Sequence, residues 1–308
     1  MILSICPNPS IDCTIELDSL DVGKLNRIDN KVETYSGKAL NVAMGIARLN
    51  GKCLATGFMF DNHAKMFEHV LDKEGVAHDF VYNKGSARVN YKIIDKRSML
   101  TEINDRGEVV ETAKQMELIE LVKKLSKDCS IAVMSGSLPK GVESTFYGDI
   151  IKAIPDNVKV IIDAERGNTL SAISSREVFM VKPNLNELEG FVGQSLHAIP
   201  DILQATRKYL DYGVKNVMVS LGGEGALLTD GTNNYFCKSA SVAVNSTVGA
   251  GDCMVAATCV ALEKGLGLDE VLRQAVAAGT AAVTTSGTNL FYKDKFDEIY
   301  DKIYTEKI

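Results

Sequence analysis

The segment Asn245–Asp252, with the sequence NSTVGAGD, combines residue types that could act on a phosphate group. It leads directly into the apolar run Cys253–Leu262, which has the length and composition of a buried helix. Because Gly249 and Gly251 relax the backbone, the turn can present unpaired N–H groups and the positive end of the helix dipole at one point. Such a point attracts phosphate, and the Asp252 carboxylate lies beside it. The segment predicts an anion hole next to a general base, as phosphoryl transfer to a hydroxyl requires; the alternative is that Asp252 only caps the helix.

Asp12 ends the segment Asn8–Asp12 (NPSID), which follows the predicted strand Ile2–Ile5. Ligands of parallel α/β sheets bind beyond the carboxyl ends of the strands, so Asp12 could accept hydrogen bonds from substrate hydroxyls. The alternative is an Asx turn after Pro9.

Lys38 and Asn41, in the segment SGKALNVA, fall before or within the first turn of a helix that we expect to reach Asn50 and to end at Gly51. A lysine at this position opposes the helix dipole. The choice is understandable if an anion lies between the lysine and the helix. The alternative is an exposed, solvated lysine.

Arg88, Asn90 and Lys92 alternate with apolar residues along a predicted strand, so they share one face of it. Arg88 and Lys92 form a local group of cations that could hold a phosphorylated substrate. An arginine can bind two phosphate oxygens at once, and a lysine acts as a point charge. The alternative is a solvated outer face on which these cations pair with Glu102.

Asn184 and Glu187, in the segment VKPNLNE, have the spacing of a helix capping box. They could also hold the waters of a Mg²⁺ that bridges nucleotide phosphates, since Mg²⁺ keeps several waters and few protein ligands, and the two roles are compatible. The Gly-rich turn in Val219–Leu228 is weak evidence for a nucleotide site, because it matches neither G-x-G-x-x-G nor the Walker pattern. The four histidines lack metal-ligand spacing, and the G-x-S-x-G motif of hydrolases does not occur.

The elements that must position these residues alternate between helix and short apolar strand from about Lys114 onward, which predicts a parallel sheet covered on both faces. The predicted strands are Ile131–Met134, Val158–Ile162, Phe179–Val181 and Val217–Ser220. The predicted helices are Met116–Ser126, Ser144–Ala153, Leu185–Val192, Ile202–Tyr212, Ala250–Lys264, Asp269–Thr285 and Lys293–Ile303.

Two earlier stretches, Thr14–Leu20 and Arg88–Asn104, alternate polar and apolar residues, which is typical of strands with one solvent-exposed face. We infer a small, mostly antiparallel sheet inserted into the α/β body. Such a sheet has too little core to be stable alone, so we expect it to pack on the main domain or on a second subunit.

The chain has 308 residues and a net charge of −6. The acidic balance argues against a nucleic-acid binder, and an anionic substrate must be held by a local cluster of cations. Seven cysteines without C-x-x-C spacing indicate small buried thiols in a reducing compartment. The N-terminus lacks the pattern of a signal peptide and no apolar stretch has membrane-spanning length, so we expect a cytoplasmic protein that does not enter membranes.

Together and in this order, the motifs resemble those of the ribokinase-like (PfkB) carbohydrate kinases over essentially the whole chain. The segments that carry the resemblance are NPSID, SGKALNVA, SGSLPKGV, VKPNLNE, VSLGGEG and STVGAGD, the last being the most diagnostic. The resemblance implies a single domain over residues 1–308, with a three-layer α/β/α body, a mainly parallel sheet and a β-sheet lid from about residues 12–36 and 86–105. It also implies ATP and Mg²⁺, and transfer of a phosphoryl group to a hydroxyl of a sugar phosphate.

The same resemblance assigns roles to residues at matching positions. The catalytic group comprises the base Asp252 and the anion hole of Gly249, Ala250 and Gly251, which receives the γ-phosphoryl group. The substrate group comprises Asp12, Gly37, Lys38, Asn41, Arg88, Asn90 and Lys92, with Arg88 on the lid contacting the substrate's phosphate. The nucleotide group comprises Asn184, Ser220, Gly222, Gly225, Thr247, Gly249 and Gly251, and Asn184 and Glu187 match the position that holds Mg²⁺ through water.

The chain departs from the family pattern G-G-K-G-x-N, which appears here with Ser36 and Ala39 in place of two glycines. We expect a Cβ at these positions to narrow or reshape the floor of the sugar site. The departure bears on the identity of the sugar more than on the chemistry, because the STVGAGD segment is intact.

Within the family, Ala87–Ile93 and Thr101–Asn104 look most like the bacterial 1-phosphofructokinases, with tagatose-6-phosphate kinases as close relatives. The expected reaction is therefore ATP-dependent phosphorylation of fructose 1-phosphate to fructose 1,6-bisphosphate. The alternatives are a kinase of tagatose 6-phosphate or of another phosphosugar, and a neutral sugar or nucleoside kinase, which leaves Arg88 harder to explain. A catalytically silent sugar-phosphate sensor is the alternative from another class, and the intact Asp252 argues against it. Relatives often dimerise through their lid sheets, and we expect a homodimer of that kind.

Overall fold

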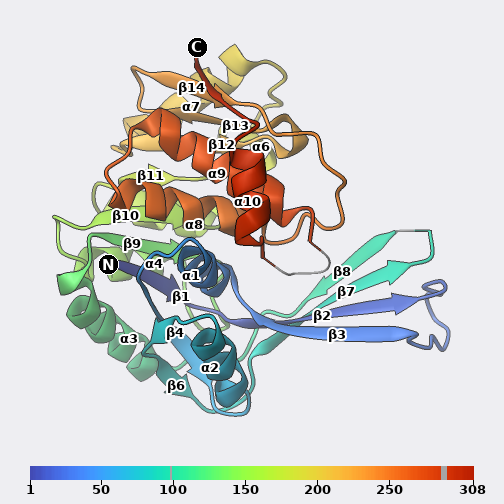
Figure 1. Cartoon of the computed structure of the whole chain (residues 1–308). Coiled ribbons are helices and arrows are strands. Elements are labelled where there is room, and N and C mark those ends of the chain that lie inside the picture. The colour runs from blue at the N-terminus through green and yellow to red at the C-terminus, as the bar shows by residue number, and fades with distance from the viewer. Residues whose placement is uncertain (98, 286–289) are drawn as a thin grey trace.

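The computed structural model describes residues 1–97, 99–285 and 290–308 and arranges their strands in two sheets (Figure 1). The larger sheet has the order β15-β14-β13-β12-β11-β10-β9-β1-β4-β5, and β6 also pairs with β4. Its strands are β1 (Ile2–Cys6), β4 (Cys53–Phe60), β5 (Ala77–His78), β6 (Val81–Asn83), β9 (Ile131–Ser135), β10 (Lys159–Asp163), β11 (Met180–Val181), β12 (Asn216–Ser220), β13 (Ala226–Thr229), β14 (Asn234–Cys237) and β15 (Thr305–Lys307). The pairs from β5 to β12 are parallel and the last three are antiparallel, which confirms a mainly parallel sheet.

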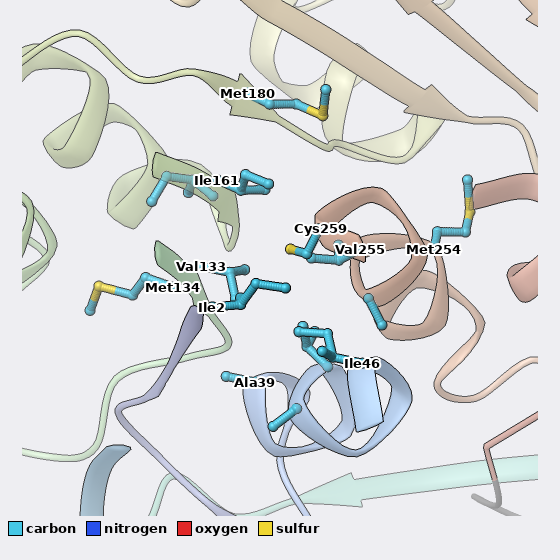
Figure 2. Close-up of a cluster of buried hydrophobic side chains, with 14 of the residues drawn as sticks. Ile2, Ala39, Ile46, Val133, Met134, Ile161, Met180, Met254, Val255 and Cys259 are labelled. Atoms are coloured by element: carbon cyan, nitrogen blue, oxygen red, sulfur yellow. The ribbon is translucent and has the colours of Figure 1, made fainter. Parts of the chain in front are cut away.

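Helices cover both faces of this sheet and make a three-layer body. They are α1 (Lys38–Arg48), α2 (Ala64–Lys73), α3 (Thr112–Leu125), α4 (Thr145–Ala153), α5 (Arg166–Ser175), α6 (Leu185–Val192), α7 (Ile199–Asp211), α8 (Ala250–Glu263), α9 (Leu268–Ala282) and α10 (Lys293–Tyr300). On one face, Ile2, Val133 and Ile161 of the central strands point toward α1 and α8 (Figure 2). On the other face, Phe58 of β4 stacks on Phe146 of α4 with ring centroids 5.9 Å apart.

The smaller sheet has the order β3-β2-β7-β8 and extends away from the body (Figure 1). Its strands are β2 (Ser10–Leu17), β3 (Asn30–Ser36), β7 (Arg88–Asp95) and β8 (Leu100–Asn104). The β2–β3 and β7–β8 pairs are antiparallel and the β2–β7 pair is parallel, so the mostly antiparallel prediction is confirmed. Position 98, inside the predicted stretch Arg88–Asn104, lies outside the described residues.

Several elements differ from the sequence prediction. Asp12 lies within β2, not in a turn after Pro9, because this strand begins at Ser10. Helix α1 ends at Arg48, and Asn50 rather than Gly51 adopts the left-handed conformation, with φ at 60°. The sequence pattern also missed α5 and β15, since the former is rich in small and polar residues and the latter is a short polar edge strand.

Two further expectations concern the cysteines and membrane spans. All seven cysteines are buried and free, which confirms the prediction of small buried thiols. Within the described part of the chain, no helix combines the length and the apolar character that crossing a membrane would require.

Candidate active site

One cavity of about 800 Å³ lies beyond the carboxyl ends of the parallel strands and extends to one face of the smaller sheet. Every residue that the sequence analysis assigned to a catalytic, substrate, nucleotide or metal position lines it. These residues are Asp12, Gly37, Lys38, Asn41, Arg88, Asn90, Lys92, Asn184, Glu187, Ser220, Gly222, Gly225, Thr247, Gly249, Ala250, Gly251 and Asp252. Elements distant in sequence therefore bring the predicted residues into one site, at the edge where parallel α/β sheets bind ligands.

The N-terminus of α8 faces this cavity. Gly249 is the N-cap residue and has a φ of 80°, a conformation that glycine adopts at little cost. No side chain caps the helix, and the amides of Gly251 and Asp252 have no acceptor among the described residues. These free donors and the helix dipole suit an anion. Gly251 itself lies inside α8, and a Cβ there would come within 3.3 Å of the Lys182 Nζ, so this glycine makes room for a cation and does not form the turn.

Asp252, in the first turn of α8, is 6% exposed. Its Oδ2 accepts a hydrogen bond of 2.8 Å from the Asn41 amide. Burial raises the pKa of Asp252 to about 6, against the opposing effects of Lys38 and of the Asn41 hydrogen bond. A carboxylate with a pKa near neutrality is suited to accept a proton.

Beneath the helix terminus, Lys38 and Lys182 share one carboxylate. Each Nζ lies 3.5 Å from the Oδ1 of Asp163, which is 2% exposed at the end of β10. Burial alone would raise the pKa of Asp163, but the two ammonium groups outweigh it and hold this pKa below its usual value. Two cations against one carboxylate leave net positive charge where the amides of α8 begin.

This cluster shows how a lysine is accommodated near the start of α1, where the helix dipole disfavours a positive charge. Part of the anionic charge beside Lys38 is supplied by the protein itself through Asp163. The sequence analysis missed both Asp163 and Lys182. The signal was present, because each directly follows the apolar core of a predicted parallel strand.

On the smaller sheet, Asp12 organises the polar face of β2 and β7. Its carboxylate accepts hydrogen bonds from Ser10 at 3.2 Å, Asn90 at 3.0 Å and Lys92 at 3.0 Å. Lys92 is opposite Glu102 in the sheet, yet its ion pair is with Asp12, and both partners are buried. The cluster presents a fixed array of polar groups to the cavity.

Arg88 differs from the other cations of the site. Its guanidinium donates to the carbonyl oxygens of Asn8 at 3.4 Å and Asp105 at 3.3 Å, and to the Asn90 side-chain oxygen at 3.3 Å. All three acceptors are neutral, and Arg88 forms no ion pair with a carboxylate of the described residues. Burial lowers its pKa, so the guanidinium bears an incompletely compensated charge facing the cavity.

At the opposite end of the cavity, Asn184 and Glu187 form the predicted capping box of α6. The Glu187 amide donates to Asn184 Oδ1 at 2.8 Å, and the Asn184 amide donates to Glu187 Oε2 at 2.8 Å. The described residues contain no cluster of three His, Cys, Asp or Glu residues that could hold a metal ion directly. One half-buried carboxylate at the edge of a large cavity fits a Mg²⁺ that keeps most of its waters, and this role remains a prediction.

The two replaced glycines have different surroundings. Ala39 is fully buried and lies on the side of α1 toward Ile2 of β1 (Figure 2), and it does not line the cavity. The expectation that a Cβ at this position reshapes the sugar site is therefore wrong, because the first turn of α1 points this side chain into the core. Ser36 does line the cavity, and its hydroxyl donates to the Asn41 Oδ1 at 3.1 Å.

Comparison with known proteins gives consistent results. A profile of the pfkB family of carbohydrate kinases matches residues 7–295. A 1-phosphofructokinase of Vibrio cholerae is 27% identical over 303 residues, covering 98% of this chain and 95% of that protein. A tagatose-6-phosphate kinase of Staphylococcus epidermidis is 30% identical over 307 residues, covering 98% of each. The crystal structure of Escherichia coli phosphofructokinase-2 in complex with substrates and products superposes with a TM-score of 0.90 at 30% identity over 98% of both chains, and another structure of that enzyme is its tetrameric inhibited form.

Proposed function

Because the chain belongs to the pfkB family of carbohydrate kinases, we propose that it is a phosphosugar kinase that converts fructose 1-phosphate to fructose 1,6-bisphosphate with Mg²⁺·ATP. The observation that supports a phosphorylated substrate is Arg88, whose half-buried guanidinium lines the cavity and donates only to neutral acceptors. A bound phosphate would supply the missing negative charge and could accept two hydrogen bonds from the guanidinium. A neutral sugar would leave this charge uncompensated.

In this proposal the sugar phosphate binds under the four-stranded sheet, with its phosphate held by Arg88 together with Lys38 and Lys92. Asp12 and Asn41 orient the sugar hydroxyls. The Lys92 ion pair and the Asn90 hydrogen bond fix the Asp12 carboxylate before the substrate arrives. Such preorganisation reduces the entropy lost on binding.

The acceptor hydroxyl lies against Asp252, and the γ-phosphoryl group against the amides at the start of α8. As the new O–P bond forms and the bond to ADP breaks, Asp252 accepts the hydroxyl proton. Lys182 offsets charge on the transferring group, whose transition state is loose and depends mainly on positioning and electrostatics. Mg²⁺, when bound through waters to Asn184 and Glu187, would neutralise nucleotide phosphate charge.

The nucleotide would lie along Ser220, Gly222 and Gly225 toward Thr247. Small apolar side chains line the cavity there, which suits the flat face of a purine: Ala240, Val242, Val244, Val276 and Val283. The whole chain then acts as one domain, in which the strands between residues 12–36 and 86–105 form a lid. Lid closure would exclude water and so limit hydrolysis of ATP.

The test is ADP release with Mg²⁺·ATP and a panel of fructose 1-phosphate, tagatose 6-phosphate, fructose 6-phosphate, fructose and ribose. The proposal expects the highest kcat/KM for fructose 1-phosphate. Preference for either 6-phosphate would keep the phosphosugar kinase and reject the specific substrate. Preference for fructose or ribose would contradict the role given to Arg88, and absence of turnover with every sugar would favour an untested phosphosugar or the silent sensor.

A further inference from the structure

Three buried side chains form a hydrogen-bonded chain that ends on Asp252. The Ser36 hydroxyl donates to Asn41 Oδ1 at 3.1 Å, and Asn41 Nδ2 donates to Asp252 Oδ2 at 2.8 Å. Ser36, Asn41 and Asp252 are 3%, 5% and 6% exposed, so bulk water does not compete freely for these bonds. The three residues come from β3, α1 and α8, which meet at the floor of the cavity.

We propose that Ser36 is a positioning residue that anchors the side-chain amide of Asn41 and so holds its N–H group against the Asp252 carboxylate. The inference rests on the proposed kinase function and deepens it. The pattern that the chain otherwise resembles has glycine at this position, which offers no side chain to do this.

The argument begins with the two orientations of an amide. An Asn side chain presents an oxygen on one side and an NH₂ group on the other, and exchanging them requires only a half-turn about its last torsion. With the oxygen toward Asp252, an ionised carboxylate would face a second acceptor. The ionised carboxylate favours the N–H group, and the Ser36 hydroxyl pairs with the amide oxygen on the far side, which holds the amide against Asp252 in this orientation.

The Asn41 amide is the only side-chain donor within hydrogen-bond distance of the Asp252 carboxylate among the described residues. The other charged groups that act on Asp252 are Lys38 from α1, Asp163 from β10 and Lys182 after β11. These act through charge at longer range and do not fix the carboxylate's rotation. The orientation of Asn41 therefore decides whether one carboxylate oxygen is held while the other is left for the acceptor hydroxyl.

Serine suits this position without strain. The backbone of Ser36 lies outside the left-handed region, whereas the next residue, Gly37, has a φ of 140°. The side chain therefore adds a donor at no conformational cost, and the turn that needs glycine retains it.

The experiment compares kcat–pH profiles of the wild type, Ser36→Ala and Ser36→Thr with the best sugar phosphate at saturating Mg²⁺·ATP. Ser4→Ala is the matched control, since the buried Ser4 hydroxyl donates to the Ala39 carbonyl of the same helix α1 at 2.6 Å, whereas the Asn41 amide is paired with Ser36 and Asp252. For Ser36→Ala we expect kcat to fall about two- to tenfold, the range for loss of one hydrogen bond. We also expect the acid limb of its kcat–pH profile to move to higher pH. A less firmly held Asn41 stabilises the ionised Asp252 carboxylate less, which raises the pKa of Asp252. Ser36→Thr, which keeps the hydroxyl, should restore the wild-type limb, and Ser4→Ala should not move it.

An acid limb that stays at the wild-type pH in Ser36→Ala would overturn the proposal, as would an equal displacement in Ser4→Ala. If the wild type phosphorylates no sugar, the proposed function fails separately. The Ser36 inference is then decided by the ¹³C-carboxyl titration of Asp252, identified as the signal lost in Asp252→Asn. A midpoint raised in Ser36→Ala relative to wild type supports it, and an unchanged midpoint refutes it.

Discussion

At the scale of single residues, two buried carboxylates of the site differ in pKa because their surroundings differ. Asp252 has one neutral hydrogen-bond partner, and burial raises its pKa to about 6. Asp163 lies between two lysines, and its pKa is lowered. One carboxylate can therefore exchange a proton near neutral pH while the other remains ionised and holds the lysines in place.

This difference predicts opposite effects of the two carboxylates on stability. The folded-state pKa of Asp252 exceeds its unfolded value. Its ionisation therefore lowers the free energy of unfolding progressively as the pH rises from about 4 to about 6. Asp252→Asn should therefore raise the free energy of unfolding above pH 6, by up to roughly 3 kcal/mol, and change it little below pH 4. Asp163→Asn should lower it at neutral pH, because a carboxyl with a depressed pKa stabilises the fold only while ionised.

Urea unfolding of both variants at pH 4 and pH 7.5 would measure these effects. Equal behaviour of Asp252→Asn and Asp163→Asn at pH 7.5 would mean that the two sites are not electrostatically distinct.

Arg88 supports a second prediction at this scale. Arg88→Ala should raise KM for the sugar phosphate about ten- to a hundredfold, since loss of a charge-assisted contact costs about 1.5–3 kcal/mol. The control is Arg97→Ala, because Arg97 lies just beyond the same strand and pairs with Asp95, away from the cavity. Steady-state kinetics of the two variants would test this. If KM is unchanged in Arg88→Ala, the substrate's phosphate binds elsewhere.

At the scale of elements, helix α8 supplies both the anion hole and the base, and Gly249 sets where it begins. Gly249→Ala should lower stability by about 1–2 kcal/mol through its left-handed φ of 80° and also reduce kcat, because the amides that would receive the γ-phosphoryl group shift. Gly265, just beyond the other end of α8, has a φ of 72° and open space around it. Gly265→Ala should cost similar stability and leave kcat unchanged. Thermal unfolding and kcat should be measured for both variants. Equal kcat values would show that the position of the N-terminus of α8 does not affect catalysis.

The sequence was informative about elements whose patterns are local. The apolar strands β9 to β12 and helix α6 with its capping box could be predicted because burial and capping act within a few residues. The positions of individual side chains in the fold were harder to predict. Asp163 and Lys182 come together only because β10 and β11 are neighbours in the sheet. The burial of Ala39 depends on how α1 packs against β1. No local sequence pattern contains either fact.

At the scale of the whole molecule, the four-stranded sheet has exposed apolar side chains on both faces. Val32 and Leu100, on the face of Asp12, are each 51% exposed, and Tyr91 and Ile103, on the other face, are 40% and 56% exposed. Such a sheet gains stability when covered. We predict a homodimer through this sheet, to be measured by multi-angle light scattering at micromolar concentration. A monomer of 33.4 kDa under these conditions would contradict it.

The central claim is that this chain transfers a phosphoryl group from ATP to a sugar phosphate with Asp252 as the base. The most direct measurement follows the sugar product and ADP together by ³¹P NMR, with fructose 1-phosphate and Mg²⁺·ATP, for the wild type and Asp252→Asn. We predict equal amounts of ADP and fructose 1,6-bisphosphate from the wild type. For Asp252→Asn we predict a kcat lower by about 10²–10⁴-fold, the usual contribution of general-base catalysis, with little change in the KM for ATP. Near-normal kcat in Asp252→Asn, or ADP formed without a phosphorylated sugar, would contradict the account.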